Sequence, residues 1–273
     1  MRSDDDYKIP EGDFIPGIYN YCDSWCERCL YTSRCMNFAM GQSIEKEIEK
    51  GKRIERSMEE NKEFWQQIDQ TMNEAAELID EEFQIKEVWQ ENTFEEDDDD
   101  DNEAMEEFEA IRKKAEEHEM SAVSQKYMML THKWLKEMKN DLVQDYDEET
   151  DQFSCSYPGL TDEELKQLTE AVELVRWFHT LISVKIRRAI TSQIEEENDG
   201  DMFEGFPKDS EGSAMVALKG VNASISGWTF LYKVIKPEAK TIKSFLHMLW
   251  WLKTNLENKF PGALTFVWPP EEK

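Results

Sequence analysis

Four of the five cysteines in this chain lie within fourteen residues, at Cys22, Cys26, Cys29 and Cys35. Their spacing is C-x3-C-x2-C-x5-C, and this is the stretch whose residue types most clearly call for chemistry. Thiolates are soft ligands that select zinc, copper(I) or iron–sulfur clusters. The stretch therefore predicts one metal centre held by these four thiolates.

The number and spacing of the thiolates separate two kinds of centre. Structural zinc sites are usually closed by two short cysteine pairs from separated turns. Here the pair formed by Cys29 and Cys35 is stretched, and only two residues separate it from Cys26. A [4Fe–4S] cube is larger than one zinc ion, and one compact loop can wrap it because each thiolate binds a different iron. The spacing favours a [4Fe–4S] cluster, with zinc as the alternative.

A disulfide pair is the third interpretation. Disulfides persist in oxidising compartments, and the chain begins Met-Arg-Ser-Asp-Asp-Asp rather than with the apolar run of a secretion signal. In a cytosolic protein, dense cysteines indicate metal binding or catalysis more often than bridges. We therefore expect a cytoplasmic protein.

The cysteine spacing also resembles known cluster loops. Cys26-x2-Cys29-x5-Cys35 resembles the [4Fe–4S] loop of the endonuclease III type of DNA glycosylases. It is similar as well to the cluster of the CRISPR-associated RecB-like nucleases, where an aromatic residue such as Tyr31 often lies between the last two cysteines. The first three cysteines match the spacing of the radical-SAM loop. These resemblances cover the cysteine loop alone, and they imply an iron–sulfur cluster rather than a particular activity.

Aromatic and basic residues surround the four cysteines. Five aromatic residues could shield a cluster from water or dock the loop on the helices, namely Tyr19, Tyr21, Trp25, Tyr31 and Phe38. Arg28 and Arg34 could offer donors and positive charge to a cluster that is net negative together with its thiolates. Hydrogen bonds to sulfur, burial and local charge set the reduction potential of such a centre.

Composition limits the possible partners. The chain has 273 residues and a formal net charge of −28, which repels the phosphates of nucleic acid and of anionic lipid. The notable basic run is Lys185-Ile-Arg187-Arg188. No apolar stretch reaches the roughly 20 residues that span a bilayer. We expect a protein or redox partner, and neither nucleic acid nor a membrane.

The fold class predicted is all-α, a bundle of about five helices that carries an N-terminal cysteine-rich metal loop. Four parts are predicted: an extended N-terminus with the metal-binding module (1–42), a long helical hairpin with an acidic connection at 95–103 (43–145), a three-helix part of the same bundle (161–260) and a tail (261–273). In the hairpin, Ser43 is predicted to cap a helix that continues to about residue 92, and a second helix is predicted over about 103–145.

The three-helix part has the clearest signals. Thr161-x-x-Glu164 is a capping box that opens a helix over about 161–197. The apolar residues of that helix recur by threes and fours, at Leu165, Leu168, Val172, Val175, His179, Ile182, Ile186 and Ala189. The next helix, over about 212–235, has small residues along one stripe, at Ala217, Gly220, Ser224 and Gly227, which predicts a central helix that a neighbour approaches closely.

Other candidate sites are weaker. His179 falls on the apolar stripe, where a histidine is most often a hydrogen-bonded core residue and less often a ligand or proton carrier. No histidine follows a carboxylate by three residues, so the Glu-x-x-His pattern of di-iron bundles is absent. The sequence also lacks a glycine-rich phosphate loop and a serine nucleophile elbow. Cys155 lies far from the other cysteines and is predicted to be a free thiol.

Three functions remain open. The first is an iron–sulfur helical protein that acts in electron transfer, redox sensing or partner docking. The second is an enzyme with a substrate pocket between the helices, near the cluster or near His179. The third is a zinc-stabilised interaction protein. The residues do not decide whether the protein is an enzyme.

Overall fold

The computed structural model describes residues 11–48, 57–79, 103–138, 141–142, 145–147, 152–198 and 207–268. In these ranges the fold is all-α, with one short antiparallel pair of strands, and this confirms the predicted fold class. Most of the predicted acidic connection, 95–102, lies outside the described residues.

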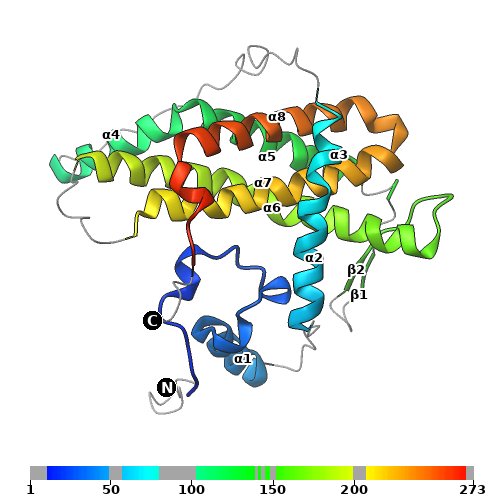
Figure 1. Ribbon diagram of the computed structural model, residues 1–273, viewed down its shortest axis with the longest axis horizontal. Coiled ribbons are helices and arrows are strands. Elements are labelled where there is room, and N and C mark those ends of the chain that lie inside the picture. The colour runs from blue at the N-terminus through cyan, green and yellow to red at the C-terminus, as the bar shows by residue number, and fades with distance from the viewer. Residues whose placement is uncertain are drawn as a thin grey trace.

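The body of the molecule is a layered bundle of long helices (Figure 1). Its helices are α4 (Glu103–Glu116), α5 (Glu119–Glu137), α6 (Asp162–Asn198), α7 (Asp209–Val234) and α8 (Ala239–Lys259). Strands β1 (Asp145–Asp147) and β2 (Gln152–Ser154) pair just before α6, with Tyr146 opposite Phe153. None of the helices in the described ranges combines the length and apolarity that crossing a bilayer requires.

The N-terminal part packs at one side of this bundle. It contains the 3-10 turns η1 (Ile18–Tyr21), η2 (Cys26–Arg28) and η3 (Thr32–Arg34), followed by α1 (Met36–Ile48). Helices α2 (Met58–Gln70) and α3 (Met72–Ala76) then run across α7, and the chain end after α8, including η7 (Pro261–Leu264), returns toward η1 (Figure 1).

Helix α6 begins and packs as its local signals predict. The Glu164 carboxylate accepts the Thr161 backbone N–H at 2.8 Å, and the Thr161 hydroxyl accepts the Glu164 N–H at 3.3 Å. Six apolar residues of the predicted stripe have no exposed surface: Leu168, Val172, Val175, Ile182, Ile186 and Ala189. The capping box therefore sets the start of α6, and the 3.6-residue period sets its buried face.

Helix α7 is the central helix, because its glycines allow α6 to approach. A Cβ atom at Gly227 would lie 2.7 Å from the backbone oxygen of Ala171, and one at Gly220 would lie 2.9 Å from the ring of Phe178. Real side chains essentially never approach so closely. The prediction drawn from the small-residue stripe is confirmed.

The helix starts predicted for the first half of the chain were wrong. Helix α1 begins at Met36, directly after the last cysteine of the loop, so Ser43 lies inside this helix rather than at its start. Helix α2 begins after Ser57, whose side chain accepts the Glu60 N–H while the Glu60 carboxylate accepts the Ser57 N–H. This is a second capping box.

The single helix predicted over about 103–145 is two helices in the structure, α4 and α5. The chain breaks between α4 and α5, where Nδ1 of His118 accepts the N–H of Met120 at 3.2 Å and caps α5. Between the two predicted helical parts, 43–145 and 161–260, lies most of the β1–β2 pair.

Two glycines in helices provide a matched test of the α6–α7 contact. Gly227→Ala should destabilise the protein by roughly 1–3 kcal/mol, because the new methyl group overlaps the backbone of α6. Gly41→Ala in α1 should instead stabilise it by about 0.5–1 kcal/mol, because nothing lies within 4 Å of that site. Urea unfolding followed by circular dichroism measures both, and equal effects would contradict the close contact.

Candidate metal centre and its anchoring

The cysteine loop, residues 22–35, is held against the helices by the residues that lie between its cysteines. Three of these side chains are buried, namely Asp23, Trp25 and Arg28. Their partners come from α2, α6 and α7. The loop therefore has an inner side that is part of the protein core.

Trp25 is the apolar anchor of the loop, with 6% of its surface exposed. Its ring stacks on Trp177 of α6, with centroids 5.2 Å apart and planes inclined by 17°. The rings of Phe64 and Trp65 on α2 meet it edge-on at 5.9 and 6.5 Å. Offset-stacked and edge-to-face arrangements are the favoured geometries of aromatic pairs.

Asp23 joins the loop to both central helices, with only 7% of its surface exposed. Its carboxylate accepts the Trp25 N–H at 3.0 Å and pairs with the Lys219 ammonium of α7 at 2.5 Å. Its backbone oxygen accepts the indole N–H of Trp177 at 3.0 Å. Because a buried carboxylate is costly unless it is paired, Lys219 is required for this arrangement.

Arg28 points into the protein, with 4% of its surface exposed. Its guanidinium lies 3.8 Å from the ring centroid of Phe64 and 3.2 Å from the carboxylate of Glu170 on α6. The Arg28 carbonyl accepts the Trp65 indole N–H at 3.0 Å. These contacts anchor the loop. The sequence predicted Arg28 as a donor to the cluster and did not indicate this anchoring role.

All four thiols of the loop are half-buried and free of disulfides. The Cys29 sulfur accepts the Tyr31 backbone N–H at 3.3 Å, and burial raises the pKa of the Cys29 thiol. Cys155 differs: 5% of it is exposed, and burial raises the pKa of its thiol to about 12. Buried thiols of this kind are inert, so Cys155 is the free structural thiol that was predicted.

The sulfur atoms do not surround one point. Within the described ranges, no group of three or more His, Cys, Asp or Glu side chains is gathered closely enough to hold a metal ion. Cys22, Cys26, Cys29 and Cys35 thus share one anchored loop, and their role as ligands stays a prediction.

Two lysines place positive charge beside the cysteine loop. The Lys219 ammonium is close enough to Cys29 to favour its thiolate, although burial dominates the pKa of that thiol. Lys185 of α6 is half-buried, and its ammonium has no hydrogen-bond or ion-pair partner in the part of the chain that the structure describes. Burial lowers the pKa of Lys185, and the nearby Arg188 lowers it further, whereas Cys22 raises it.

The sequence shows Lys185 only as part of a basic run. Its charge acts on Cys22 because α6 packs on the loop. No local signal marks Lys219, which pairs with a residue 196 positions earlier in the chain.

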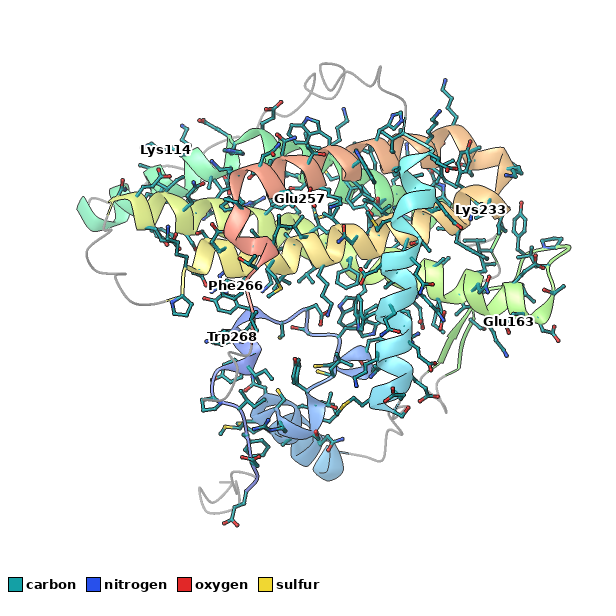
Figure 2. The ribbon with its side chains drawn as sticks, viewed as in Figure 1. Lys114, Glu163, Lys233, Glu257, Phe266 and Trp268 are labelled. Atoms are coloured by element: carbon teal, nitrogen blue, oxygen red, sulfur yellow. The ribbon has the colours of Figure 1, made fainter. Side chains whose placement is uncertain are left out.

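The first turn of α7 and the chain end both contact η1, and Figure 2 shows Phe266 and Trp268 at the chain end. The Asp209 carboxylate accepts two hydrogen bonds from Arg188, at 2.8 and 3.0 Å, and one from Ser192 at 2.7 Å. Burial and the negative charge of Asp209 raise the pKa of Tyr21 to about 12. Phe266 and Trp268 meet the Tyr21 ring edge-on, and the Trp268 indole N–H donates to the Ile18 oxygen at 3.2 Å.

The aromatic residues predicted around the cysteines differ in how deeply they are buried. Of the five aromatic residues, only Trp25 is buried; Tyr21 and Phe38 are half-buried, and Tyr19 and Tyr31 are exposed. Arg34 pairs with Asp13, at 3.5 Å, and so ties the loop to the segment before η1.

His179 is half-buried rather than fully buried, and its neighbour Phe178 fills the core. Its Nδ1 lies 2.7 Å from the Arg176 oxygen, and its ring stacks on His132 of α5 with centroids 5.9 Å apart. Burial lowers its pKa. These contacts place His179 at the α5–α6 surface.

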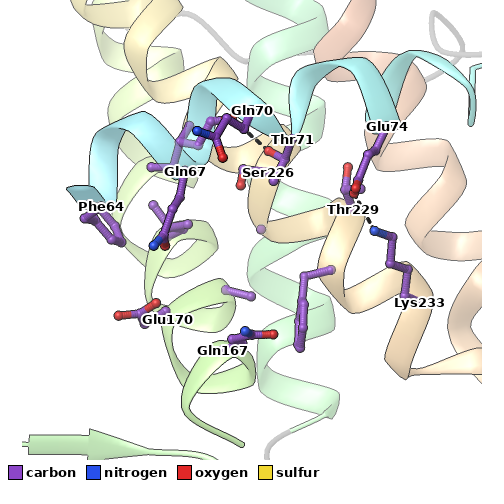
Figure 3. A pocket seen from close by; sticks show the side chains of 15 residues that line it. Phe64, Gln67, Gln70, Thr71, Glu74, Gln167, Glu170, Ser226, Thr229 and Lys233 are labelled. Carbon is purple, nitrogen blue, oxygen red and sulfur yellow. Dashed lines mark hydrogen bonds and ion pairs between the residues drawn. The ribbon is translucent and has the colours of Figure 1, made fainter. Parts of the chain in front are cut away.

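A hollow of about 330 Å³ lies between α2, α3, α6 and α7 (Figure 3). Phe64 and Glu170 line one end of it, and both contact Arg28 of the cysteine loop. Sequence reasoning did not find this hollow, because its walls come from three separate parts of the chain.

No protein-family model, no curated protein and no solved structure matches this chain.

The anchoring of the loop can be tested at Trp25. Trp25→Ala should lower the free energy of unfolding by about 3–5 kcal/mol, because it empties the space between α2 and α6. The matched control is Tyr19→Ala, an exposed aromatic residue in η1, which should change stability by no more than about 0.5 kcal/mol. Urea unfolding measures both, and similar losses would show that Trp25 does not anchor the loop.

The Asp209 contacts predict a dependence on pH. Burial would raise the pKa of this carboxyl, but the hydrogen bonds from Arg188 and Ser192 outweigh it and hold the pKa below its ordinary value. A lowered pKa stabilises the fold above the unfolded value of about 3.9, and this contribution disappears as the pH falls through the folded pKa. Asp209→Asn should therefore cost about 1 kcal/mol at pH 7.

The difference between wild type and Asp209→Asn should shrink when urea unfolding is repeated in acid. Asp162→Asn, at an exposed carboxylate in the first turn of α6, serves as the control and should behave like wild type at both pH values. If Asp209→Asn lowers the free energy of unfolding by the same amount at neutral and at acid pH, the ion pair is not the cause of the loss.

Proposed function

We propose that Cys22, Cys26, Cys29 and Cys35 bind one [4Fe–4S] cluster, and that the protein uses it in electron transfer or redox sensing with a protein partner. The observation that carries this proposal is the division of the loop into two sets of residues. The side chains of Asp23, Trp25 and Arg28 are buried, while all four thiols stay half-buried at the boundary.

Half-buried thiols suit cysteines that bind a metal centre better than cysteines that only pack in the core. A cysteine that serves only packing is buried and protonated, as Cys155 is. Four half-buried thiols on a firmly attached loop are accessible to a cofactor and near the surface, where an electron can pass to a partner. The absence of disulfides agrees with a reducing compartment such as the cytoplasm.

The charge around the loop supports an anionic group. A [4Fe–4S] cluster with four thiolates is net negative, and nearby charge and hydrogen bonds tune its potential. Lys185 presents an ammonium near Cys22 without a partner in the described residues, although the chain as a whole has a net charge of −28. The Tyr31 N–H also favours the thiolate of Cys29, whereas the charge of Lys219 is offset there by its partner Asp23.

The cluster supplies one-electron redox chemistry when it is bound. The residues of this chain would hold and tune it: Trp25 and the aromatic rings of α2 would keep water from its inner side, and Lys185 would compensate part of its charge. Zinc remains the alternative, in an interaction protein stabilised by the metal. Zinc would need the four thiolates on one ion, whereas in a cube each thiolate binds a different iron.

An enzyme is the second candidate, and the hollow between α2, α6 and α7 favours it. The hollow begins at Phe64 and Glu170, beside the cysteine loop, so a substrate there would lie near the cluster. His179 does not line this hollow, and a role for it in such a reaction has no support.

The metal content of anaerobically purified protein tests the proposal. We expect about four iron and four sulfide per chain and a brown protein with broad visible absorption. A Cys26→Ser/Cys29→Ser double variant should lose the iron and keep its helical circular dichroism, because the bundle has its own core. Cys155→Ser should keep the full iron content.

If the purified protein contains stoichiometric zinc and no iron, the zinc-stabilised interaction protein is the correct alternative. Full iron content in the double variant, or a disulfide within the loop of protein kept under reducing conditions, would contradict the assigned ligands.

A further inference from the structure

Helices α5 and α6 bring two histidine side chains together at the surface of the bundle. The rings of His132 on α5 and His179 on α6 are stacked, with centroids 5.9 Å apart and planes inclined by 24°. The two helices pack against each other, and in the buried contact the hydroxyls of Ser124 and Ser183 lie 3.5 Å apart. Side chains on facing, well-packed helices are the usual source of metal sites in helical bundles.

The ring of His179 is oriented as that of a metal ligand. Its Nδ1 lies 2.7 Å from the carbonyl oxygen of Arg176, which can only accept a hydrogen bond, so Nδ1 carries the proton. Histidines that bind a metal almost always donate their second ring N–H to an acceptor of this kind. Burial lowers the pKa of His179, and the nearby His132 lowers it further. Both effects favour the neutral imidazole that a metal ion requires.

The other nitrogen of His179 is available to an ion. Its Nε2 lies 3.3 Å from the hydroxyl of Thr180, which is a long hydrogen bond to an exposed residue that water can replace. His132 is exposed, and within the described ranges no hydrogen bond or ion pair fixes its ring. One imidazole is therefore held in place, and the other is free to turn toward it.

The spacing of the two rings suits a shared ion. Two metal–nitrogen bonds of about 2.0–2.1 Å at a tetrahedral angle place the ring centroids roughly 5 Å apart. The observed separation is 5.9 Å, and a small rotation of the exposed His132 ring closes the difference. No third His, Cys, Asp or Glu side chain of the described residues gathers with the pair, so water would complete the coordination.

The chemistry of the pair indicates which ion it would take. Imidazole nitrogens suit zinc, copper and nickel, whereas magnesium and calcium prefer oxygen ligands. The formal net charge of −28 also attracts cations to this chain.

We propose that His132 and His179 together bind one late transition-metal ion of the Ni²⁺ or Zn²⁺ type, which links α5 to α6. The cysteines of the loop are not part of this site, and the proposal does not depend on the cluster. Because the folded chain holds both imidazoles in place, the ion should stabilise the fold.

Equilibrium dialysis of the full chain against Ni²⁺ tests the site. Any binding by the loop thiols is common to all histidine variants, so the site is measured as a difference. Wild type should bind one more Ni²⁺ per chain than a His132→Ala/His179→Ala double variant. If both rings hold one ion, His132→Ala and His179→Ala should each lose it as completely as the double variant does.

His118→Asn is the matched control, because it removes a histidine outside the pair. His118 caps α5 by accepting the Met120 N–H, and asparagine is a strong N-cap, so this variant should fold and keep the ion. Cys26→Ser/Cys29→Ser should likewise keep the ion that depends on the histidines. Circular dichroism verifies that each variant retains its helices.

Urea unfolding gives a second measurement. Added Ni²⁺ should raise the unfolding midpoint of wild type and of His118→Asn more than that of either alanine variant. The proposal is overturned if wild type and the double variant bind the same number of Ni²⁺ ions, or if either single alanine variant keeps the ion. It is also overturned if His118→Asn loses the ion, or if Ni²⁺ shifts all midpoints equally.

Discussion

The contact between Gly220 of α7 and Phe178 of α6 determines how the rest of this structure can be built. With no side chain at Gly220, the Phe178 ring lies against the α7 backbone and sets the register of the two helices. The residues next to this contact, Lys219 and Trp177, then lie close enough for one residue to bind both. That residue is Asp23, which pairs with Lys219 through its carboxylate and accepts the Trp177 indole N–H through its backbone.

The cysteine loop depends on this register, because the loop is too short and too polar to form a core of its own. Its attachment uses three kinds of interaction: aromatic packing at Trp25, a buried ion pair at Asp23, and a cation over an aromatic ring at Arg28. The anchors occupy positions between the cysteines. As a result, the helices fix the backbone of the loop without burying its thiols.

The predictions that succeeded rest on local signals. Thr161 and Glu164 are three residues apart, and the apolar stripe of α6 repeats every turn, so both were visible in one short window of sequence. Ser57 and Glu60 carry the same capping signal, which the prediction of a continuous helix overrode. The break at His118 had a weaker signal, since histidine is an uncommon N-cap.

The parts of the candidate site that the sequence could not predict are the long-range ones. The cysteine spacing indicates a centre, but nothing near Asp23 shows that its partner is Lys219, and nothing near Lys185 shows that it lies beside Cys22. Such pairs follow only from the packing of α6 against α7, which is a property of the whole bundle.

Arg28 connects the cysteine loop with the hollow between α2, α6 and α7. Its guanidinium lies over Phe64 and pairs with Glu170, and both of these residues form the end of the hollow. Its backbone lies between Cys26 and Cys29 and is tied to Trp65 of α2. A displacement of Phe64 or Glu170 must therefore change the surroundings of Arg28, and a change in the cysteine loop must act on the hollow through the same residue.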